Sequence, residues 1–188
     1  VWGGDALVKI YGKEYDGNKA IGESWEISAV EDDNSVVSNG FLIGNDLTDV
    51  VETYLGDIVG DKIYERYGNE FPVLIKLLDI QNNLSLQVHP DDETALERHD
   101  SYGKTECWYV LDASPDAKIY YGLKEELSAL EFYNACMSET IESSLNVIHP
   151  KKGDFLFIPP QTLHAATGGI QIIEVQQVSD ITYRVYDW

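Results

Sequence analysis

The segment Gly153-Asp154-Phe155-Leu156-Phe157-Ile158-Pro159-Pro160-Gln161-Thr162-Leu163-His164 predicts a β-strand, then a turn, then a histidine. Gly153 opens the apolar run, and the two prolines end it because proline has no backbone N–H to donate to a sheet. A histidine directly after such a turn lies near the end of the strand. His164 is therefore the first candidate for a metal ligand.

Two earlier segments predict further ligands for the same site. In residues 86–90, Leu-Gln-Val-His-Pro, side chains alternate between the two faces of a strand, so Gln87 and His89 share one face. Glu106 lies in residues 105–110, whose aromatic and β-branched side chains predict the next strand of a long hairpin. Three strand segments of a β-barrel wall could therefore surround one cation with four ligands: Gln87, His89, Glu106 and His164.

The rest of the chain predicts antiparallel strands with helical interruptions. Helical spacing of apolar residues appears near 47–67, broken at Gly56 and Gly60, and near 124–134, while residues 91–97 predict a capped single-turn helix. The further segments with strand-like patterns are 7–11, 23–28, 36–37, 73–78, 170–175 and 181–186, with another near Val147. The sequence has no internal repeat or linker. We therefore expect one all-β domain over 1–188 with helical insertions.

Composition and charge exclude several functional classes. The 188 residues, 44% of them hydrophobic, are enough for one sizeable core. With 33 acidic and 13 basic residues, the net charge of −20 disfavours nucleic acid and anionic membrane surfaces as partners. No apolar run approaches about 20 residues, and the start lacks a signal-peptide pattern, so we expect a soluble, cytoplasmic protein. Cys107 and Cys136 predict free buried thiols without a redox role.

Because basic residues are scarce, those near the candidate ligands need an explanation. Lys76 lies in an apolar strand segment, where an unpaired lysine would be costly to bury. It could bind a phosphate, pair with a core carboxylate, or extend to the surface. Arg184 carries a planar, permanently charged group that could bind an anion or pair with Asp180 or Asp187. The other two histidines, His99 and His149, lie in polar, turn-like sequence and are predicted to be surface residues.

Several of these segments resemble motifs of a known superfamily. Residues 153–164 resemble the second cupin motif, and Gln87-x-His89 with Glu106 resembles the first. Gln161 replaces a glycine of the general pattern, and Gln87 replaces a histidine that many cupins have. With residues 103–109, 158–165 and 179–187, the sequence resembles class I phosphomannose isomerase of the short bacterial type. The likeness extends to residues 2–4, 22–25 and 71–76 and so covers almost the whole chain.

The resemblance implies a fold, a cofactor and a reaction. The fold is a double-stranded β-helix, that is, a cupin or jelly-roll barrel. The cofactor is one Zn²⁺, and the reaction interconverts mannose 6-phosphate and fructose 6-phosphate. The implied zinc ligands are the four candidates Gln87, His89, Glu106 and His164. Members normally carry a second, C-terminal barrel after the block that ends here, so we expect this chain to lack it.

The resemblance also implies roles for the remaining polar residues. Arg184 matches the catalytic arginine, Lys76 and Ser85 match positions near the substrate phosphate, and Lys104 matches a site lysine. Moving a proton between adjacent carbons requires a base and a group that stabilises the enediolate oxygen. The base remains open between Glu174, Lys104 and a zinc-bound water.

Two other functions are compatible with a metal-binding cupin. One is a sugar or sugar-phosphate sensor that keeps the metal but does not turn over its ligand. The other is an oxygenase, which requires iron with an open three-ligand face and has no use for a phosphate site. Gln87 and the three basic residues Lys76, Lys104 and Arg184 argue against the oxygenase.

Overall fold

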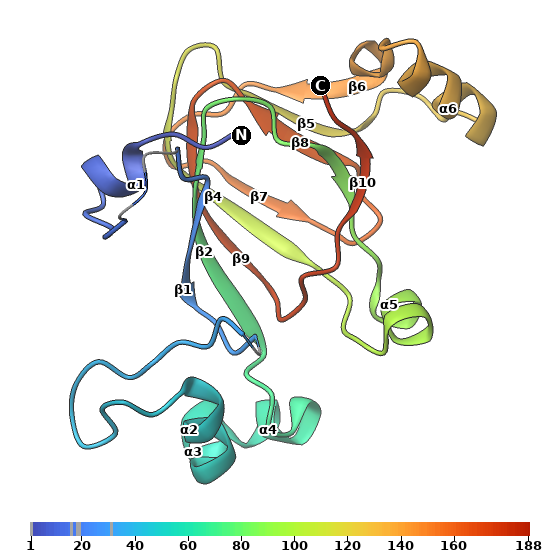
Figure 1. Ribbon diagram of the computed structural model, residues 1–188. Helices are drawn as coiled ribbons and strands as arrows, with labels where there is room; N and C mark the ends of the chain where they lie inside the picture. Colours follow the sequence, from blue (N-terminus) through green and yellow to red (C-terminus); the bar gives the residue numbers. More distant parts are fainter. Residues whose placement is uncertain (1, 16, 18–19, 31) are drawn as a thin grey trace.

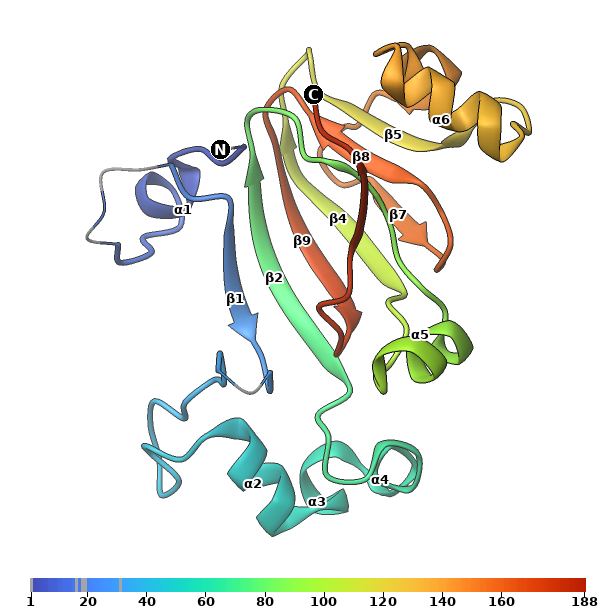
Figure 2. The same ribbon diagram turned by 45° about the vertical axis from the view of Figure 1, so that its right-hand side comes forward.

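The computed structural model describes residues 2–15, 17, 20–30 and 32–188. It contains two antiparallel five-stranded sheets that pack against each other, as Figures 1 and 2 show. The first sheet has the order β1 (Glu23–Ile27), β2 (Val73–Ile80), β9 (Ile170–Gln177), β4 (Glu106–Ala113) and β7 (Phe155–Ile158). The second has the order β10 (Tyr183–Tyr186), β3 (Leu86–Val88), β8 (His164–Thr167), β5 (Lys118–Leu123) and β6 (Leu145–Ile148). The predicted all-β class with helical insertions is confirmed.

Short helices lie at the ends and edges of the two sheets. They are α1 (Ala6–Lys9), α2 (Leu47–Tyr54), α3 (Gly56–Val59), α4 (Asp61–Tyr67), α5 (Asp92–His99), α6 (Ala129–Met137) and the 3₁₀ helix Ile141–Ser144. In Figure 1, α2 to α4 gather beyond one end of β1 and β2, and α6 lies at the opposite end of the molecule. No helix in the described part of the chain is long and apolar enough to span a membrane.

The main core lies between the two sheets. It joins Trp108 of β4 and Ile172 of β9 to Ile119 of β5 and Ala166 of β8, all of them buried. A second cluster beneath α6 contains Leu86, Tyr120 and Leu145. Because both sheets contribute apolar side chains to one core, polar residues on their inner faces are held in fixed positions.

The helical predictions are confirmed in place but shifted at their ends. The 47–67 region forms three helices, where one or two were expected, and the chain turns at Gly60 with a φ of 87°. The second insertion begins at Ala129 and not at 124, because Ser128 and Glu131 form a capping box that fixes its start. The helix predicted over 91–97 extends to His99, with the Asp91 side chain accepting a hydrogen bond from the Thr94 N–H at 2.8 Å.

Three strand predictions were wrong. Residues 7–11 were predicted as a strand, but α1 forms there, because the distant Asp79 carboxylate accepts the Ala6 N–H at 2.8 Å at the start of the helix. The short 36–37 segment makes only an isolated bridge between Val36 and Asp46. The expected hairpin of β3 with β4 does not exist: β3 pairs with β8 and β10, while β4 pairs with β7 and β9. The two strands belong to different sheets, and α5 lies between them in the chain.

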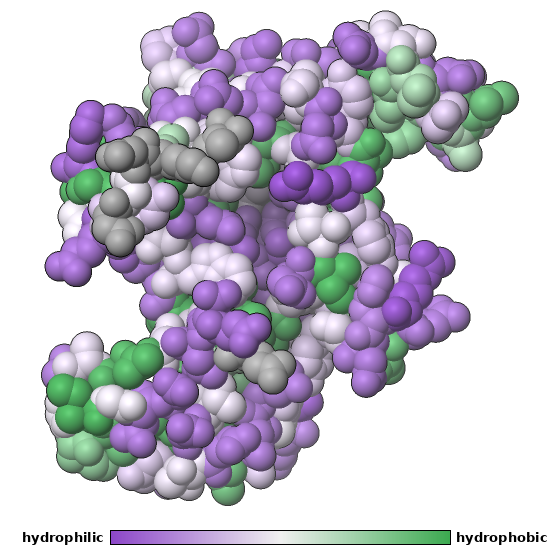
Figure 3. Space-filling model, in the orientation of Figure 1, coloured by the Kyte–Doolittle hydropathy of each residue, from purple (hydrophilic) through white to green (hydrophobic). Residues whose placement is uncertain are grey.

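Strand register sets the positions of the polar residues. In the first sheet Lys76, Glu174 and Trp108 lie opposite one another on adjacent strands. In the second sheet Arg184, Gln87 and His164 do the same. Directly opposite residues of an antiparallel pair point to the same face. The space-filling view in Figure 3 shows a recess near the centre of a mainly hydrophilic face.

Candidate metal centre

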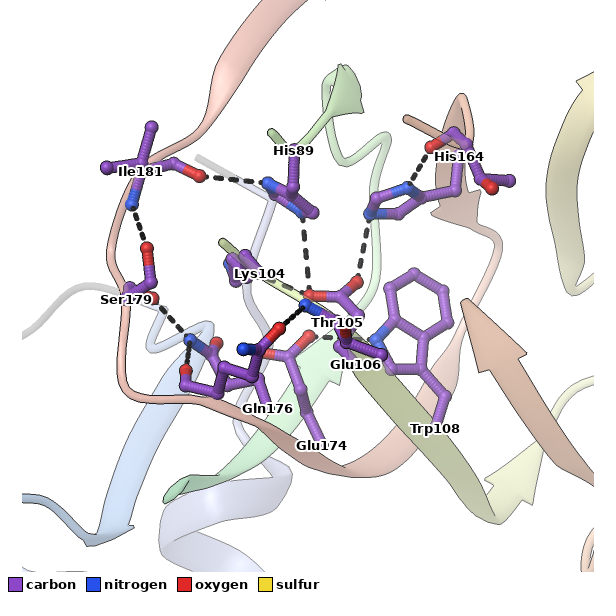
Figure 4. Close-up of polar contacts among 12 residues, drawn as sticks. His89, Lys104, Thr105, Glu106, Trp108, His164, Glu174, Gln176, Ser179 and Ile181 are labelled. Atoms are coloured by element: carbon purple, nitrogen blue, oxygen red, sulfur yellow. Dashed lines mark hydrogen bonds and ion pairs between the residues drawn. The ribbon is translucent and has the colours of Figure 1, made fainter. Parts of the chain in front are cut away.

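Three buried side chains from both sheets converge between them. Glu106 begins β4 of the first sheet, His164 begins β8 of the second, and His89 directly follows β3. Their potential ligand atoms all lie within 4.8 Å of one another, as Figure 4 illustrates. Two neutral ring nitrogens and a carboxylate are a donor set that suits zinc and related divalent metals. The three residues therefore form a group that could hold a metal ion.

Backbone carbonyls fix the orientation of both imidazoles. His89 Nδ1 lies 3.0 Å from the Ile181 carbonyl oxygen, and His164 Nδ1 lies 2.9 Å from that of Thr162. A carbonyl oxygen can only accept, so each Nδ1 carries the proton and donates it. In the neutral tautomer each Nε2 then presents its lone pair, as a metal ligand requires. The two Nε2 atoms lie 3.5 Å and 3.0 Å from the Glu106 carboxylate.

The atoms facing the centre form no hydrogen bonds among the described residues. In the described chain, His89 Nε2, His164 Nε2 and both carboxylate oxygens of Glu106 are buried without a hydrogen bond. Each such buried group costs about 1–3 kcal/mol if it stays unsatisfied. A cation between these four atoms would satisfy all of them, so the residues present fit a bound metal.

The electrostatics favour the ligand forms of these side chains. Burial, reinforced by the charge of Lys104, lowers the pKa of His89 to about 3, so its ring is neutral. Burial alone raises the pKa of Glu106, but the close His164 ring and the charge of Lys104 outweigh burial and hold that pKa below its ordinary value. A neutral imidazole and an ionised carboxylate are the forms that bind metals.

Gln87, the fourth predicted ligand, lies beside this group. Its Cα pairs with that of His164 on one side and that of Arg184 on the other, so the three side chains share one face. Gln87 is half-buried. Its role as a ligand stays a prediction, and its position is compatible with that role.

A cavity of about 240 Å³ adjoins the metal group. Its lining brings together the fourth candidate ligand, Gln87, and all five of the other predicted site residues: Lys76, Ser85, Lys104, Glu174 and Arg184. Trp2, Glu23, Trp25, Asp180 and Thr182 complete the polar and aromatic part of the lining. Residues far apart in the sequence thus share one small space.

Ser85 Oγ is buried and, within the described ranges, has no hydrogen-bond partner. An unpartnered hydroxyl in a cavity wall is available to a bound ligand.

Lys76 is buried among anionic and aromatic groups. Its Nζ lies 3.6 Å from Glu23 and 3.9 Å from Glu174, and 4.6 Å from the centre of the Trp25 ring. Pairing with carboxylates, one of the alternatives considered for this lysine, is therefore what the structure shows. The same ammonium group also lines the cavity, so it remains available to an anion that enters.

Glu174 is fixed by Trp108 and lies in a strongly desolvating environment. The indole N–H of Trp108 donates to Glu174 Oε2 at 2.8 Å. Burial, followed by the charge of Glu106, raises the pKa of Glu174, against the opposing effect of Lys104 and Lys76. A carboxyl group with a raised pKa is suited to exchange protons near neutral pH.

Lys104 and Arg184 differ in burial. Lys104 is buried, with its Nζ 3.6 Å from Glu106 Oε2. Arg184 is exposed at the cavity, and among the described residues it forms no ion pair with Asp180 or Asp187. The alternative of a structural pair for Arg184 is thus not formed.

The structure adds residues that the sequence interpretation missed. Trp108 follows Glu106 by two positions on β4, so strand alternation could have placed it on the same face. Glu23 and Trp25 show the same spacing on β1. Gln176 pairs with Glu106 across β9 and β4, a relation visible only from the register.

The residues expected to lie outside the site do so. His99 and His149 are exposed, as predicted. Cys107 and Cys136 are free but only half-buried, so the prediction of buried thiols was wrong in degree. Cys107 lies between the buried Glu106 and Trp108 on β4 and therefore faces the opposite side of the sheet.

Comparison with known proteins gives consistent matches. A family model described as the catalytic domain of type I phosphomannose isomerase matches residues 1–121. The mannose-6-phosphate isomerase of Streptococcus mutans is 41% identical over 192 residues, which cover 100% of this chain and 57% of that protein.

Solved structures agree. The crystal structure of the mannose 6-phosphate isomerase from Bacillus subtilis matches with a TM-score of 0.89 at 39% identity, covering 100% of this chain and 58% of that one. A putative mannosephosphate isomerase from Archaeoglobus fulgidus matches with a TM-score of 0.84 at 25% identity, covering 99% and 60%. This chain thus spans less than two thirds of the length of these relatives.

Proposed function

Since this chain belongs to the family of type I phosphomannose isomerases, we propose that it binds one zinc ion and interconverts mannose 6-phosphate and fructose 6-phosphate. The observation that carries this proposal is the shared cavity. One side of it adjoins the buried His89–Glu106–His164 group, and its walls hold Lys76, Lys104 and Arg184. A sugar phosphate needs both features, because its carbonyl end requires an electrophile and its phosphate requires cations.

The phosphate would bind to local positive charge. The net charge of −20 cannot attract a dianion from a distance, so contacts inside the cavity must do so. The ammonium group of Lys76 can bind the phosphate and give up its long contacts with Glu23 and Glu174. The buried Ser85 hydroxyl can donate to a phosphate oxygen.

The zinc site would consist of Gln87, His89, Glu106 and His164. A zinc ion bound there would act as a Lewis acid toward the substrate oxygens. The protein contributes the geometry: the Ile181 and Thr162 carbonyls hold both rings in the tautomer that leaves Nε2 free. Lys104, 3.6 Å from Glu106, adds positive charge beside the ligands.

Glu174 is the residue best placed to move the proton through an enediol. The bond from Trp108 fixes one carboxylate oxygen, Oε2, and leaves Oε1 for the substrate and for Lys76. Its raised pKa favours a carboxylate that takes up a proton from one carbon and then returns it to the next. Lys104 and a water remain alternatives for this role. Arg184 would stabilise the negative charge that develops on the enediolate oxygen.

A coupled assay of mannose 6-phosphate conversion, with and without a chelator, tests the proposal. We expect turnover that disappears on chelation and returns when zinc is added back. Titration of the zinc-loaded protein with fructose 6-phosphate in a calorimeter identifies the alternative. Binding of the sugar phosphate without any turnover would favour a sensor and contradict the proposed reaction.

A further inference from the structure

The loop between β9 and β10, residues 178–182, contacts both parts of the site. Its Ile181 carbonyl oxygen accepts the hydrogen bond from His89 Nδ1 at 3.0 Å. Asp180 and Thr182 of the same loop line the cavity. The path of this loop therefore determines how His89 is oriented and what shape the cavity wall has.

Gln176, the last residue but one of β9, ties down this loop. It is only 2% exposed. Its side-chain Nε2 donates to the Ser179 carbonyl oxygen at 2.5 Å and to the Gln177 carbonyl oxygen at 3.0 Å. Figure 4 shows the sequence of contacts from Gln176 through Ser179 and Ile181 to His89.

Ser179 connects the amide to Ile181. Its backbone N–H donates to the Gln177 carbonyl at 2.8 Å, and its hydroxyl accepts the Ile181 N–H at 3.4 Å. Ser179 is itself buried, so neither of its carbonyl and hydroxyl groups has ready access to water. Without the amide of Gln176, the Ser179 carbonyl would lose its partner inside the protein.

We propose that Gln176 is a positioning residue of the metal centre, which fixes residues 178–182 and so keeps the Ile181 carbonyl on His89 Nδ1. The proposal deepens the proposed function and rests on its metal site. Hydrogen bonds to the second ring nitrogen of a ligating histidine fix its tautomer and direction, and their loss typically weakens metal binding by about 10- to 100-fold.

The chemistry of the side chain explains why an amide stands here. One NH₂ group supplies two donors, and the two acceptors it meets are both backbone carbonyls. A carboxylate at this position would offer only acceptors when ionised and would repel both carbonyls. A methionine has a similar size but no donor, so Gln176→Met removes the two bonds with little change in volume.

The experiment measures Co²⁺ affinity from the visible absorption of the bound ion and Zn²⁺ affinity by competition. We expect Gln176→Met to bind about 10- to 100-fold more weakly than the unmodified chain. Gln171→Met is the matched control: Gln171 lies on the same strand and bonds Tyr11 Oη at 2.7 Å, with no contact to His89. Its affinity should stay within about twofold, the scatter of independent substitutions.

A double-mutant cycle tests whether the effect passes through His89. In a His89→Ala background, Gln176→Met should weaken metal binding by no more than about twofold, because the ring it orients is gone. A full loss in the His89→Ala background would overturn the proposal.

The same measurements distinguish a failure of the metal site from a failure of the role proposed for Gln176. If the unmodified chain binds neither ion, the metal site itself is refuted. If it binds both ions and Gln176→Met binds equally well, only the role of Gln176 is refuted. Circular dichroism checks folding. If Gln176→Met does not fold, Gln176→Asn replaces it, because the shorter amide cannot keep both hydrogen bonds. The same changes in metal affinity are then expected.

Discussion

Among single residues, the environment of a ring nitrogen distinguishes a candidate ligand from an ordinary histidine. His89 and His164 are buried with Nδ1 bound to a carbonyl and Nε2 left without a hydrogen bond. His99 is exposed and contacts the Tyr183 hydroxyl at 2.6 Å. Sequence could identify His164 by its spacing from glycine and proline, and His89 by its sharing a strand face with Gln87. The carbonyls that orient the two rings come from Thr162 and Ile181, which no motif marks.

His164→Ala should lose the metal and the proposed activity together. The substitution removes a fully buried candidate ligand, whose Nε2 lies 3.0 Å from the Glu106 carboxylate. We expect zinc content near zero after dialysis and a rate at least about 100-fold lower, as for loss of an essential metal group. Atomic absorption and the coupled assay measure both. His149→Ala, at an exposed position, should change neither.

Arg184→Ala should separate metal binding from turnover. Arg184 lines the cavity from β10, and the residues that hold the two imidazoles do not include it. We expect unchanged zinc content and a kcat lower by about 10²–10³, the usual effect of removing a group that stabilises developing negative charge. Arg98→Ala, on the exposed side of α5, is the control. A variant with full rate would refute the role given to Arg184.

Trp108→Phe should shift the pH dependence of the rate. The indole N–H donates to Glu174 and lowers the pKa of that carboxyl, which burial raises. Removing the donor lets the pKa of Glu174 rise further. If Glu174 acts as the ionised base, activity is lost as the pH falls through this pKa, so the acid limb should move to higher pH. Rate profiles of both proteins measure the shift, and superimposable acid limbs would exclude Glu174 as the titrating base.

Among the secondary-structure elements, local signals predicted strands well and their pairing poorly. The strands predicted over 23–28, 73–78 and 170–175 form as β1, β2 and β9, because their apolar patterns are local properties. The pairing of β3 is not determined locally. Its residue Gln87 lies opposite His164 and Arg184, which follow it in the chain by 77 and 97 residues. The sequence could therefore suggest the candidate ligands, whereas the sheet that carries each one required the structure.

One departure from the general cupin pattern also has an explanation at this scale. Gln161 stands where the pattern has glycine, and its φ of 63° is the conformation that favours glycine. Its backbone N–H donates to the His89 carbonyl at 2.8 Å, and its side-chain amide donates to Asp91 at 2.6 Å. These bonds hold a non-glycine residue in the turn before His164 and connect it to the N-terminus of α5.

Ser128→Ala should destabilise the molecule without affecting the proposed reaction. Ser128 caps α6 by accepting the Glu131 N–H at 3.3 Å, and α6 contributes no residue to the 240 Å³ cavity. We expect a loss of about 1 kcal/mol, typical of a serine cap. Urea unfolding measures this loss, and kcat should be unchanged. Ser138→Ala, at the other end of the helix, should have a smaller effect, and equal losses would show that the cap does not matter.

For the whole molecule, basic residues are unevenly distributed: the cavity lining holds as many basic side chains as acidic ones, whereas the chain as a whole is strongly acidic. The chain has 33 acidic and 13 basic residues, yet three of those basic residues, Lys76, Lys104 and Arg184, line one small cavity. Composition predicted that polyanions are poor partners, and it gave no hint of this local concentration. The cluster forms only because β2, the α5–β4 connection and β10 meet there, so it depends on the complete two-sheet fold.

The metal should contribute strongly to global stability because its candidate ligands join the two sheets. Glu106 comes from the first sheet, and His89 and His164 come from the second or its continuation. Zinc at about 1,000 times its dissociation constant would add about 4 kcal/mol, or about 8–16 °C in Tm for a chain of this size. Calorimetry of the zinc-loaded and chelated protein measures the shift. His164→Ala should show almost none, and a full shift in that variant would place the stabilising metal outside the candidate centre.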